Sequence, residues 1–194
     1  MSGASVAAIV LAAGASRRLG EPKQLAMVGG ERLLDRAVRV ALEAGLEPVV
    51  VVLGAEAQRI ERKCRLDGAL VVLNPGWEEG MGSSIRVGIG ALADVQGVVL
   101  MTCDQPVVTA EHLDLLVETG LSGPAAIAAS VYAGGLRVPA FFPESEFGCL
   151  AELTGDQGAR GLLAGARPVE LTGGELDVDT VEELEEARLR FGKV

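Results

Sequence analysis

The sequence has few aromatic residues, few cysteines and no surplus of positive charge. Aromatic residues make up 3% of its 194 residues, so we expect a core of aliphatic side chains. The three cysteines are far apart, which argues against a disulfide framework and against a zinc site with close ligand spacing. The formal net charge of −10 argues against the broad basic surface that nucleic acids and anionic membranes require. Any anionic ligand must therefore be held by a few local positive charges.

The sequence also lacks a secretion signal and a long apolar run. The apolar stretch at residues 6–13 is short and has no basic residue before it. No uninterrupted apolar run approaches the length of about 18 residues that crosses a bilayer. We therefore expect a cytoplasmic protein that binds neither membranes nor nucleic acids.

Apolar runs alternate with segments of helical spacing along the first two thirds of the chain. Buried strands are predicted at residues 6–11, 48–53, 69–73, 97–101 and 125–129. Helices are predicted at residues 33–42, 56–65, 83–93 and 111–119. This alternation predicts an α/β fold, a Rossmann-like, mostly parallel, twisted sheet with helices on both faces.

The regular alternation ends near residue 130. The segment 130–163 is interrupted by Gly134, Gly135, Pro139 and Pro143. There we expect an irregular insertion of strands and short helices that folds over one edge of the sheet and binds substrate. Thr180 and Glu183 have the spacing of a capping box and predict a final helix. No linker divides the chain, so residues 1–194 are expected to form a single domain.

The segment "LAAGASRRLGEPKQL" follows the first predicted strand. The segment contains three small residues, Ala12, Ala13 and Gly14. Their small size lets backbone N–H groups approach a phosphate at the carboxyl edge of the sheet. Arg17, Arg18 and Lys23 then supply positive charge that suits a triphosphate. The segment fits neither the G-x-G-x-x-G pattern nor the P-loop pattern, so it supports neither a dinucleotide enzyme nor a P-loop ATPase. The alternative to phosphate binding is a solvated basic loop.

Acidic residues occur at two places suited to a metal ion. Asp104 directly follows an apolar strand, so its carboxylate is expected at the carboxyl edge of the sheet beside the basic loop. Carboxylate oxygens are hard ligands that suit Mg²⁺, although Asp104 is equally acceptable as a turn residue before Pro106. Asp177 and Asp179 lie two apart in an extended segment and point the same way. Asp179 is a second metal ligand or a cap of the final helix.

A second segment of small residues, "GMGSSIRVG", is predicted to begin a helix. The hydroxyl groups of Ser83 and Ser84 and nearby backbone donors can approach a base or a ribose, and Ser83 also fits an ordinary N-cap. Arg86 is either a phosphate contact or a surface residue. His112 is expected at the surface without a catalytic role. Trp77 either walls a ligand pocket or packs in the core.

Taken together, these motifs resemble the MobA-like nucleotidyltransferases, and especially their molybdenum cofactor cytidylyltransferase branch. The first segment is similar to the family signature L-A-A-G-x-S-x-R-x-G-x-P-K, with Arg18 and Lys23 on its basic positions and Arg17 on a variable one. Five further segments match in the same order, "NPGWEEGMGSSIRVGI", "MTCDQPVVT", "VPAFFP", "TGDQGAR" and "DVDTVEEL". One departure is Val181, which stands where the family usually has proline.

The resemblance implies a fold like that of nucleotide-diphospho-sugar transferases. It also implies a nucleotidyl transfer reaction. CMP would pass from CTP to the phosphate of the molybdenum-molybdopterin cofactor with release of pyrophosphate, and Mg²⁺ would be the metal. Residues up to about 120 would bind the nucleotide and residues 121–180 the acceptor, with the pterin near residues 138–142 and 154–160. A molybdenum hydroxylase or its maturation factor would receive the product.

The resemblance also implies roles for individual residues. The implied catalytic residues are Lys23, Arg18 and Asp104, and the implied metal ligands are Asp104 and Asp179. The implied nucleotide-binding residues are Leu11, Ala12, Ala13, Gly14, Arg18, Lys23, Gly82, Ser83 and Ser84. "LAAG" favours cytidylyl over guanylyl transfer, because the guanylyl branch has Ala-Gly-Gly in this motif. Guanylyl transfer, nucleotidyl transfer to another sugar or polyol phosphate, and a non-catalytic nucleotide- or cofactor-binding accessory of a molybdenum hydroxylase remain as alternatives.

Overall fold

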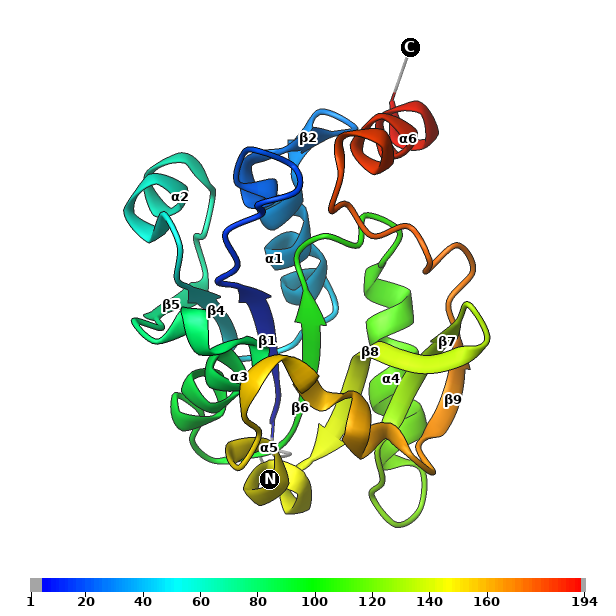
Figure 1. The fold of residues 1–194 in the computed structure, drawn as a ribbon. Helices are drawn as coiled ribbons and strands as arrows, with labels where there is room; N and C mark the ends of the chain where they lie inside the picture. The colour runs from blue at the N-terminus through cyan, green and yellow to red at the C-terminus, as the bar shows by residue number, and fades with distance from the viewer. Residues whose placement is uncertain (1–4, 193–194) are drawn as a thin grey trace.

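The computed structural model describes residues 5–192, which contain a seven-stranded sheet in the order β5-β4-β1-β6-β8-β7-β9. The strands are β1 Ser5–Ala12, β4 Val49–Leu53, β5 Ala69–Leu73, β6 Val95–Thr102, β7 Ala128–Tyr132, β8 Gly135–Pro143 and β9 Arg167–Glu170. β8 pairs antiparallel with β6 and β7, and the other neighbours pair parallel. In Figure 1 the arrows of β1 and β6 point upward, so the carboxyl ends of these strands meet near the centre of the molecule.

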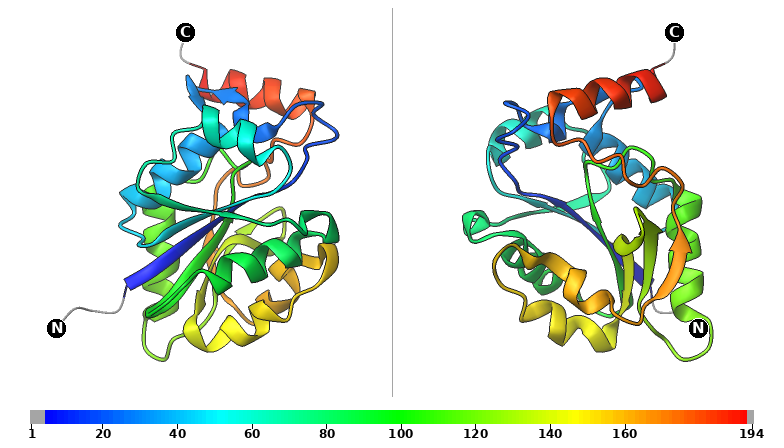
Figure 2. Two further views of the ribbon diagram at one scale, coloured as in Figure 1. Left: turned by 90° about the vertical axis from the view of Figure 1, so that its left-hand side faces the viewer. Right: turned by 45° about the vertical axis from the view of Figure 1, so that its right-hand side comes forward.

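Helices cover both faces of the sheet, as predicted. Alternate residues of β1 belong to two separate apolar clusters, as the period of two in a strand requires. One cluster joins Val10 to α1 (Leu33–Glu43) and α4 (Ala110–Leu121), and the other joins Ile9 to α3 (Met81–Gly90) and α5 (Phe147–Ala151). Figure 2 shows these helices on opposite sides of the sheet. The α/β fold with a mostly parallel sheet is therefore confirmed.

The predicted helices are present with shifted ends. α2 spans Ala57–Lys63, and α3 begins two residues earlier than predicted, at Met81. Gly80 takes the N-cap position of α3 with a φ of 121°, which glycine adopts without steric strain, so Ser83 lies inside the first turn and is not the cap. At the end of the chain, α6 (Val181–Phe191) starts with the predicted capping box, in which Glu183 accepts a hydrogen bond of 2.8 Å from the backbone N–H of Thr180.

The segment that we expected to fold over the edge of the sheet instead enters the sheet. β7 and β8 form a hairpin through Ala133 and Gly134, whose φ values of 47° and 70° are those of a two-residue type I′ turn. The hairpin places β8 beside β6, with Leu100 opposite Ala140. The expected edge position was therefore wrong for these strands, because the second half of β8 is buried and extends the sheet. The strand predicted at residues 125–129 begins at Ala128.

The remaining elements are short. After β8 come the expected short helices, η3 (Glu144–Glu146), α5 and η4 (Gly155–Leu163). The strands β2 (Met27–Val28) and β3 (Glu31–Arg32) form a separate two-stranded sheet, and two more 3₁₀ turns are η1 (Lys23–Leu25) and η2 (Trp77–Glu79). Figure 1 shows α6 beside β2 at one end of the molecule. Within residues 5–192, no helix combines the length and apolar character needed to cross a membrane.

Two glycines, Gly97 and Gly120, make room for the ring of Phe141. Phe141 on β8 is fully buried, and a methyl group on Gly120 in α4 would overlap its ring. We expect Gly120→Ala to lower the free energy of unfolding by about 2 kcal/mol, because overpacking outweighs the higher helix propensity of alanine. The melting temperature measured by calorimetry should fall by about 4–8 °C.

Gly90 offers a matched control for this substitution. It is the last residue of α3, and no atom lies within 4 Å of the position that a methyl group would take. Gly90→Ala should leave the melting temperature unchanged or raise it by a few degrees. Equal melting temperatures for the two variants would show that Phe141 can move away from Gly120.

His112 is buried, in contrast to the surface position that we expected. Its side chain points from α4 toward β7, and its Nε2 atom lies 2.8 Å from the hydroxyl oxygen of Ser130. Ser130 donates its own proton to the carbonyl of Pro139 at 2.6 Å, so Nε2 of His112 must be the donor. Burial lowers the pKa of His112 to about 4, because the charged imidazolium would lose its hydration. The pattern of apolar and polar residues along α4 did not by itself show which face of the helix carries His112.

Because the pKa of His112 is lowered by burial, we expect the protein to lose stability in mild acid. Above pH 6.5 it is neutral in both states, whereas between pH 6.5 and 4 it is protonated chiefly in the unfolded chain, so the folded state loses stability as the pH falls. At pH 5 the loss is about 2 kcal/mol, or about 4–8 °C in melting temperature. His112→Gln, which keeps a donor for Ser130, should remove this part of the pH dependence. If the melting temperatures of the wild type and of His112→Gln fall by the same amount between pH 7.5 and 5, the interpretation is refuted.

Candidate active site

Two adjoining pockets open at the carboxyl ends of β1 and β6. The first, which we call the loop pocket, measures about 380 Å³ and is lined by the segment after β1 and by the region around the start of α3. The second, the hairpin pocket, measures about 330 Å³ and is lined by the β7–β8 hairpin, by η4 and by the segment before α6. Both pockets share the lining residues Lys23, Met81, Thr102, Asp104 and Asp156.

A cluster of opposite charges lies where the two pockets meet. The ammonium group of Lys23 donates hydrogen bonds to Asp104 at 2.5 Å and to Asp179 at 2.6 Å. The guanidinium group of Arg18 contacts the other carboxylate oxygen of Asp179 at 2.6 Å. Lys23 and Asp104 are largely buried, whereas the Arg18 side chain is 69% exposed. The structure thus brings together four residues from three separate parts of the sequence.

The charges of this cluster stabilise one another. Burial alone would lower the pKa of Lys23, but the charge of Asp104 and the hydrogen bonds to Asp104 and Asp179 raise it overall. Burial would raise the pKa of Asp179, but Lys23 and Arg18 lower it overall. At neutral pH the cluster therefore presents an ammonium group held between carboxylates.

The loop after β1 is held by its own side chains. Gln24 is fully buried and donates hydrogen bonds to the carbonyls of Ala12 and Gly14, at 2.7 and 3.1 Å. The hydroxyl of Ser16 accepts a bond of 3.0 Å from the backbone N–H of Lys23. Both contacts fix the distance between the start and the end of the loop. Lys23 is therefore positioned by the loop as well as by the carboxylates.

The opposite wall of the loop pocket comes from the turn before α3. Asn74 is buried and donates to the hydroxyls of Ser83 at 2.8 Å and of Ser84 at 3.0 Å. Of these two serines, Ser84 lines the loop pocket, whereas Ser83 donates to the carbonyl of Gly80 behind the wall. A methyl group on Gly82 would lie 2.8 Å from the backbone of Thr154, so Gly82 serves close packing in this structure.

Trp77 lines the loop pocket and packs against the backbone of the turn that follows β4. A methyl group on Gly54 would lie 2.6 Å from Cβ of Trp77 and 2.8 Å from the carbonyl of Ala13. Gly54 therefore lets the tryptophan approach the loop. An indole ring in this place provides a flat apolar surface on which a nucleobase can stack.

The hairpin pocket contains polar residues for which the sequence analysis had no role. Gln105 donates a hydrogen bond of 2.7 Å to the hydroxyl of Tyr132, which in turn donates to the carbonyl of Val138 at 2.9 Å. Arg137 lies over the Tyr132 ring, with 5.6 Å between the guanidinium carbon and the ring centre. Asp177 also lines this pocket, and burial together with the charge of Asp104 raises its pKa to about 7.

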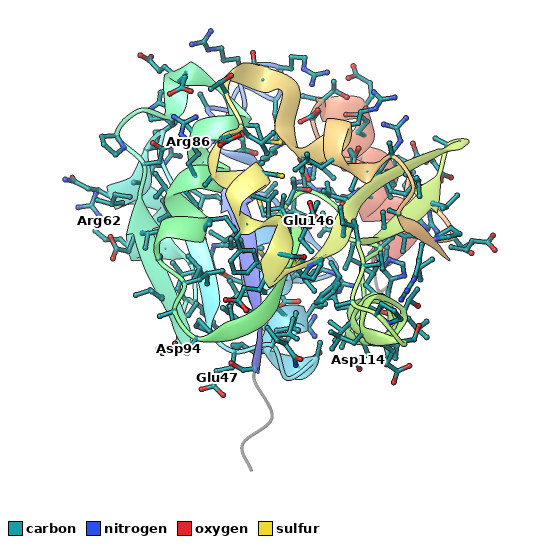
Figure 3. All side chains as sticks on the ribbon, turned by 90° about the horizontal axis from the view of Figure 1, so that it is seen from below. Glu47, Arg62, Arg86, Asp94, Asp114 and Glu146 are labelled. Carbon is teal, nitrogen blue, oxygen red and sulfur yellow. The ribbon has the colours of Figure 1, made fainter. Side chains whose placement is uncertain are left out.

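Beside both pockets, α3 and the turn before it pack closely against the start of η4 and the residues that precede it. A methyl group on Gly80 would lie 2.5 Å from the backbone of Gly155. Arg86 pairs with Glu79 at 2.7 Å and donates a hydrogen bond of 2.5 Å to the carbonyl of Leu153. Figure 3 labels Arg86 on α3 near this segment. Arg86 thus has protein partners, the carboxylate of Glu79 and the carbonyl of Leu153.

The structure brings most of the residues expected at the site into one place. The loop pocket is lined by Leu11, Ala12, Ala13, Gly14, Lys23, Ser84 and Asp104. Arg18 faces Asp179 outside that pocket, and Arg17, to which the family resemblance gave no role, lines it. Gln24 and Gln105 were not predicted to be site residues. Each is a polar residue in a buried stretch directly after a charged site residue, a pattern that was available as a signal.

Asp104 and Asp179 fit a divalent metal ion. Their oxygens lie within hydrogen-bond distance of one ammonium nitrogen, so they are close enough to share a cation. Within residues 5–192, no three His, Cys, Asp or Glu side chains gather into a metal site of their own. Mg²⁺ is commonly held by one or two carboxylates together with water and substrate phosphates, which is compatible with this pair.

Comparisons with known proteins identify relatives along nearly the whole chain. The chain is 32% identical over 197 residues to the purine catabolism protein PucB of Bacillus subtilis, covering 93% of this chain and 94% of PucB. The crystal structure of Rv0371c from Mycobacterium tuberculosis is 33% identical, with a TM-score of 0.87 over 97% of this chain and 100% of that chain. A structure of Rv0371c in complex with manganese is 31% identical, with a TM-score of 0.81 over 95% and 98% of the two chains.

Other relatives match about half of the chain. Nicotine blue oxidoreductase of Paenarthrobacter nicotinovorans is 38% identical over 102 residues, 52% of this chain and 50% of that protein. A probable molybdenum cofactor guanylyltransferase of Opitutus terrae is 34% identical over 106 residues, 55% and 51% of the two proteins. Solved structures at 15% identity, with TM-scores of 0.75 and 0.76, share the fold alone, which is like that of nucleotide-diphospho-sugar transferases.

The family model described as the MobA-like NTP transferase domain matches residues 8–171. This match includes the second part of β1, the loop with Lys23, and Asp104, and ends before Asp179. Because the match covers most of the chain and PucB aligns along almost its full length, the chain belongs to the MobA-like NTP transferases, a family of nucleotidyltransferases.

Proposed function

We propose that this protein transfers CMP from CTP to the phosphate of the molybdenum-molybdopterin cofactor and releases pyrophosphate. The observation that carries the proposal is the position of Lys23 and Asp104, which line both pockets at their junction. A group in that position can contact the α-phosphate of a nucleotide in one pocket and an acceptor in the other. The "LAAG" motif supports CTP, and the similarity to a probable molybdenum cofactor guanylyltransferase supports the acceptor.

The two pockets support a division of the chain between the substrates. The loop pocket is lined by residues 11–104 together with Asp156, and the hairpin pocket mainly by residues 102–179. We therefore propose that residues up to about 120 bind the nucleotide and residues 121–180 bind the acceptor. In this arrangement, Ala12, Ala13 and Gly14 leave space for the triphosphate, and Ser84 faces the nucleoside.

The reaction requires positioning and charge neutralisation more than proton transfer. An oxygen of the acceptor phosphate forms a bond to the α-phosphorus, and the bond from that phosphorus to the β-phosphate oxygen breaks. A phosphate monoester is already largely ionised near neutral pH, so the attacking oxygen needs no general base. Lys23 and Arg18 would stabilise the negative charge that develops on the transferred and leaving phosphates. The product would pass to a molybdenum hydroxylase or its maturation factor.

The metal ion in this proposal is Mg²⁺, held by Asp104 and Asp179. When bound, it would neutralise phosphate charge and orient the triphosphate. The manganese complex of Rv0371c supports a divalent ion in this family. Lys23 bonds to both carboxylates in this structure, so the ammonium group and the metal would share them.

Nucleotide selectivity tests the proposal directly. With purified protein, Mg²⁺ and molybdenum-molybdopterin cofactor, pyrophosphate release should be at least about tenfold faster with CTP than with GTP or ATP. CTP with Mg²⁺ should also raise the melting temperature more than GTP does, since a ligand of the folded state stabilises it.

The same assay separates the alternatives. Turnover of GTP without turnover of CTP would replace cytidylyl transfer by guanylyl transfer. Turnover on a sugar or polyol phosphate, and none on the cofactor, would assign a different acceptor. Binding of nucleotide and cofactor with no pyrophosphate release would indicate a non-catalytic accessory protein.

A further inference from the structure

Arg137 is a charged residue in the hairpin pocket that has no anionic partner. Its side chain lines the pocket, and its Nε atom is buried without a hydrogen-bond partner. In the part of the chain that the structure describes, no carboxylate or carbonyl hydrogen-bonds or ion-pairs with this side chain, and its one specific contact is with the Tyr132 ring. Although Asp177 lines the same pocket, the two residues form no ion pair. Arg137 as a whole is half-buried, but leaving its buried Nε donor without an acceptor is unfavourable, which points to an anionic ligand in the pocket as the missing partner.

The guanidinium group of Arg137 lies over the ring of Tyr132, whose own position is fixed by hydrogen bonds. Tyr132 cannot rotate freely, because its hydroxyl accepts from Gln105 and donates to the carbonyl of Val138. Tyr132 and Arg137 lie on the two strands of one hairpin, on either side of its two-residue turn. Gln105 directly follows Asp104, which belongs to the charge cluster. Arg137 is thus placed at a set position relative to the junction of the pockets.

We propose that Arg137 binds the anionic group of the acceptor, a phosphate monoester, in the hairpin pocket, and thereby selects acceptors that carry this group. The choice of a phosphate monoester rests on the proposed function. A planar guanidinium group can donate two parallel hydrogen bonds to phosphate oxygens, which a lysine in the same place cannot do. Arg137 lies outside the loop pocket, so its effect should fall on the acceptor and not on the nucleotide.

Methyl phosphate, the smallest phosphate monoester probe, tests this inference by ³¹P NMR titration. The loop pocket is first saturated with a non-hydrolysable CTP analogue and Mg²⁺, so that the probe meets the remaining pocket. We expect Arg137→Gln to weaken methyl phosphate binding by about 10- to 100-fold, the usual effect of losing a charged hydrogen-bond donor, and Arg137→Lys to be intermediate. The dissociation constant of the CTP analogue should change less than about twofold.

Arg62→Gln is the matched control, since Arg62 is exposed on α2 and lies outside both pockets (Figure 3). It should bind methyl phosphate as the wild type does. Melting temperatures show that each variant is folded, and Arg137→Lys keeps the test valid if the glutamine variant does not fold. Turnover with molybdenum cofactor adds a second measurement, in which Arg137→Gln should raise the KM for the cofactor and leave the KM for CTP unchanged.

Three results would overturn the inference. These are no methyl phosphate binding by the wild type, equal binding by the wild type and both Arg137 variants, and loss of affinity for the CTP analogue in place of methyl phosphate. The proposed function fails separately, when the wild type releases no pyrophosphate with the cofactor. Methyl phosphate binding that depends on Arg137 would still support the anion site in that case.

Discussion

Replacing Lys23 with methionine should lower kcat for pyrophosphate release by about 10²- to 10³-fold. Methionine keeps most of the length and apolar surface of the lysine stem but removes the charge that we place on the phosphates. The loss should appear mainly in kcat, because the negative charge on the phosphates grows in the transition state. The measurement is steady-state pyrophosphate release with CTP, Mg²⁺ and molybdenum cofactor.

The substitution also leaves Asp104 and Asp179 facing each other without the ammonium group between them, so the melting temperature must be measured alongside. Lys63→Met provides the same chemical change on an exposed lysine of α2 and should retain full activity. If a folded Lys23→Met protein keeps more than about a third of the wild-type kcat, Lys23 does not take part in the proposed chemistry.

Asp104→Asn should reduce kcat by about 10³-fold, because it affects two cations at once. The amide keeps the shape of the side chain, but it weakens the contact with Lys23 and is a poorer ligand for a hard metal ion. In the presence of CTP, the affinity for Mn²⁺ measured by electron paramagnetic resonance should fall by at least about tenfold. This second measurement tests the metal role apart from turnover.

Asp114→Asn is the control for this change, since Asp114 is exposed on α4 (labelled in Figure 3) and lines neither pocket. It should alter neither Mn²⁺ affinity nor turnover. If Asp104→Asn binds Mn²⁺ as tightly as the wild type does, the metal lies elsewhere. Unchanged turnover would contradict the catalytic role of Asp104 altogether.

Much of the fold follows from local patterns in the sequence. The continuous apolar run of β1 is buried on both faces, and this is how a central parallel strand is recognised. The capping box at Thr180 and Glu183 is a contact between neighbours in the chain, so its residues predict it directly. The position of β8 between β6 and β7 could not be predicted in this way, because strand order depends on pairing between residues about 40 positions apart.

The candidate site, too, was predictable from the sequence only in part. The charged residues Lys23, Asp104 and Asp179 were expected at the site from motif and family resemblance, and they meet in the structure. The positions of Arg17 and Arg18 were not predictable from their order, because Arg17 lines the loop pocket whereas the guanidinium group of Arg18 contacts Asp179. Arg137 drew no attention as a single basic residue in a strand, because its missing partner becomes visible only when its surroundings are known.

By itself, the sequence determined the class of fold and the family, and it predicted which charged groups would contact phosphate, because these depend on periodicity and on motifs of neighbouring residues. Only the tertiary structure decided that His112 is buried, that the hairpin joins the sheet, and that two pockets share Lys23 and Asp104. The physical reason is that burial, pKa and the direction of a side chain depend on residues distant in the chain, which come together only when the sheet forms.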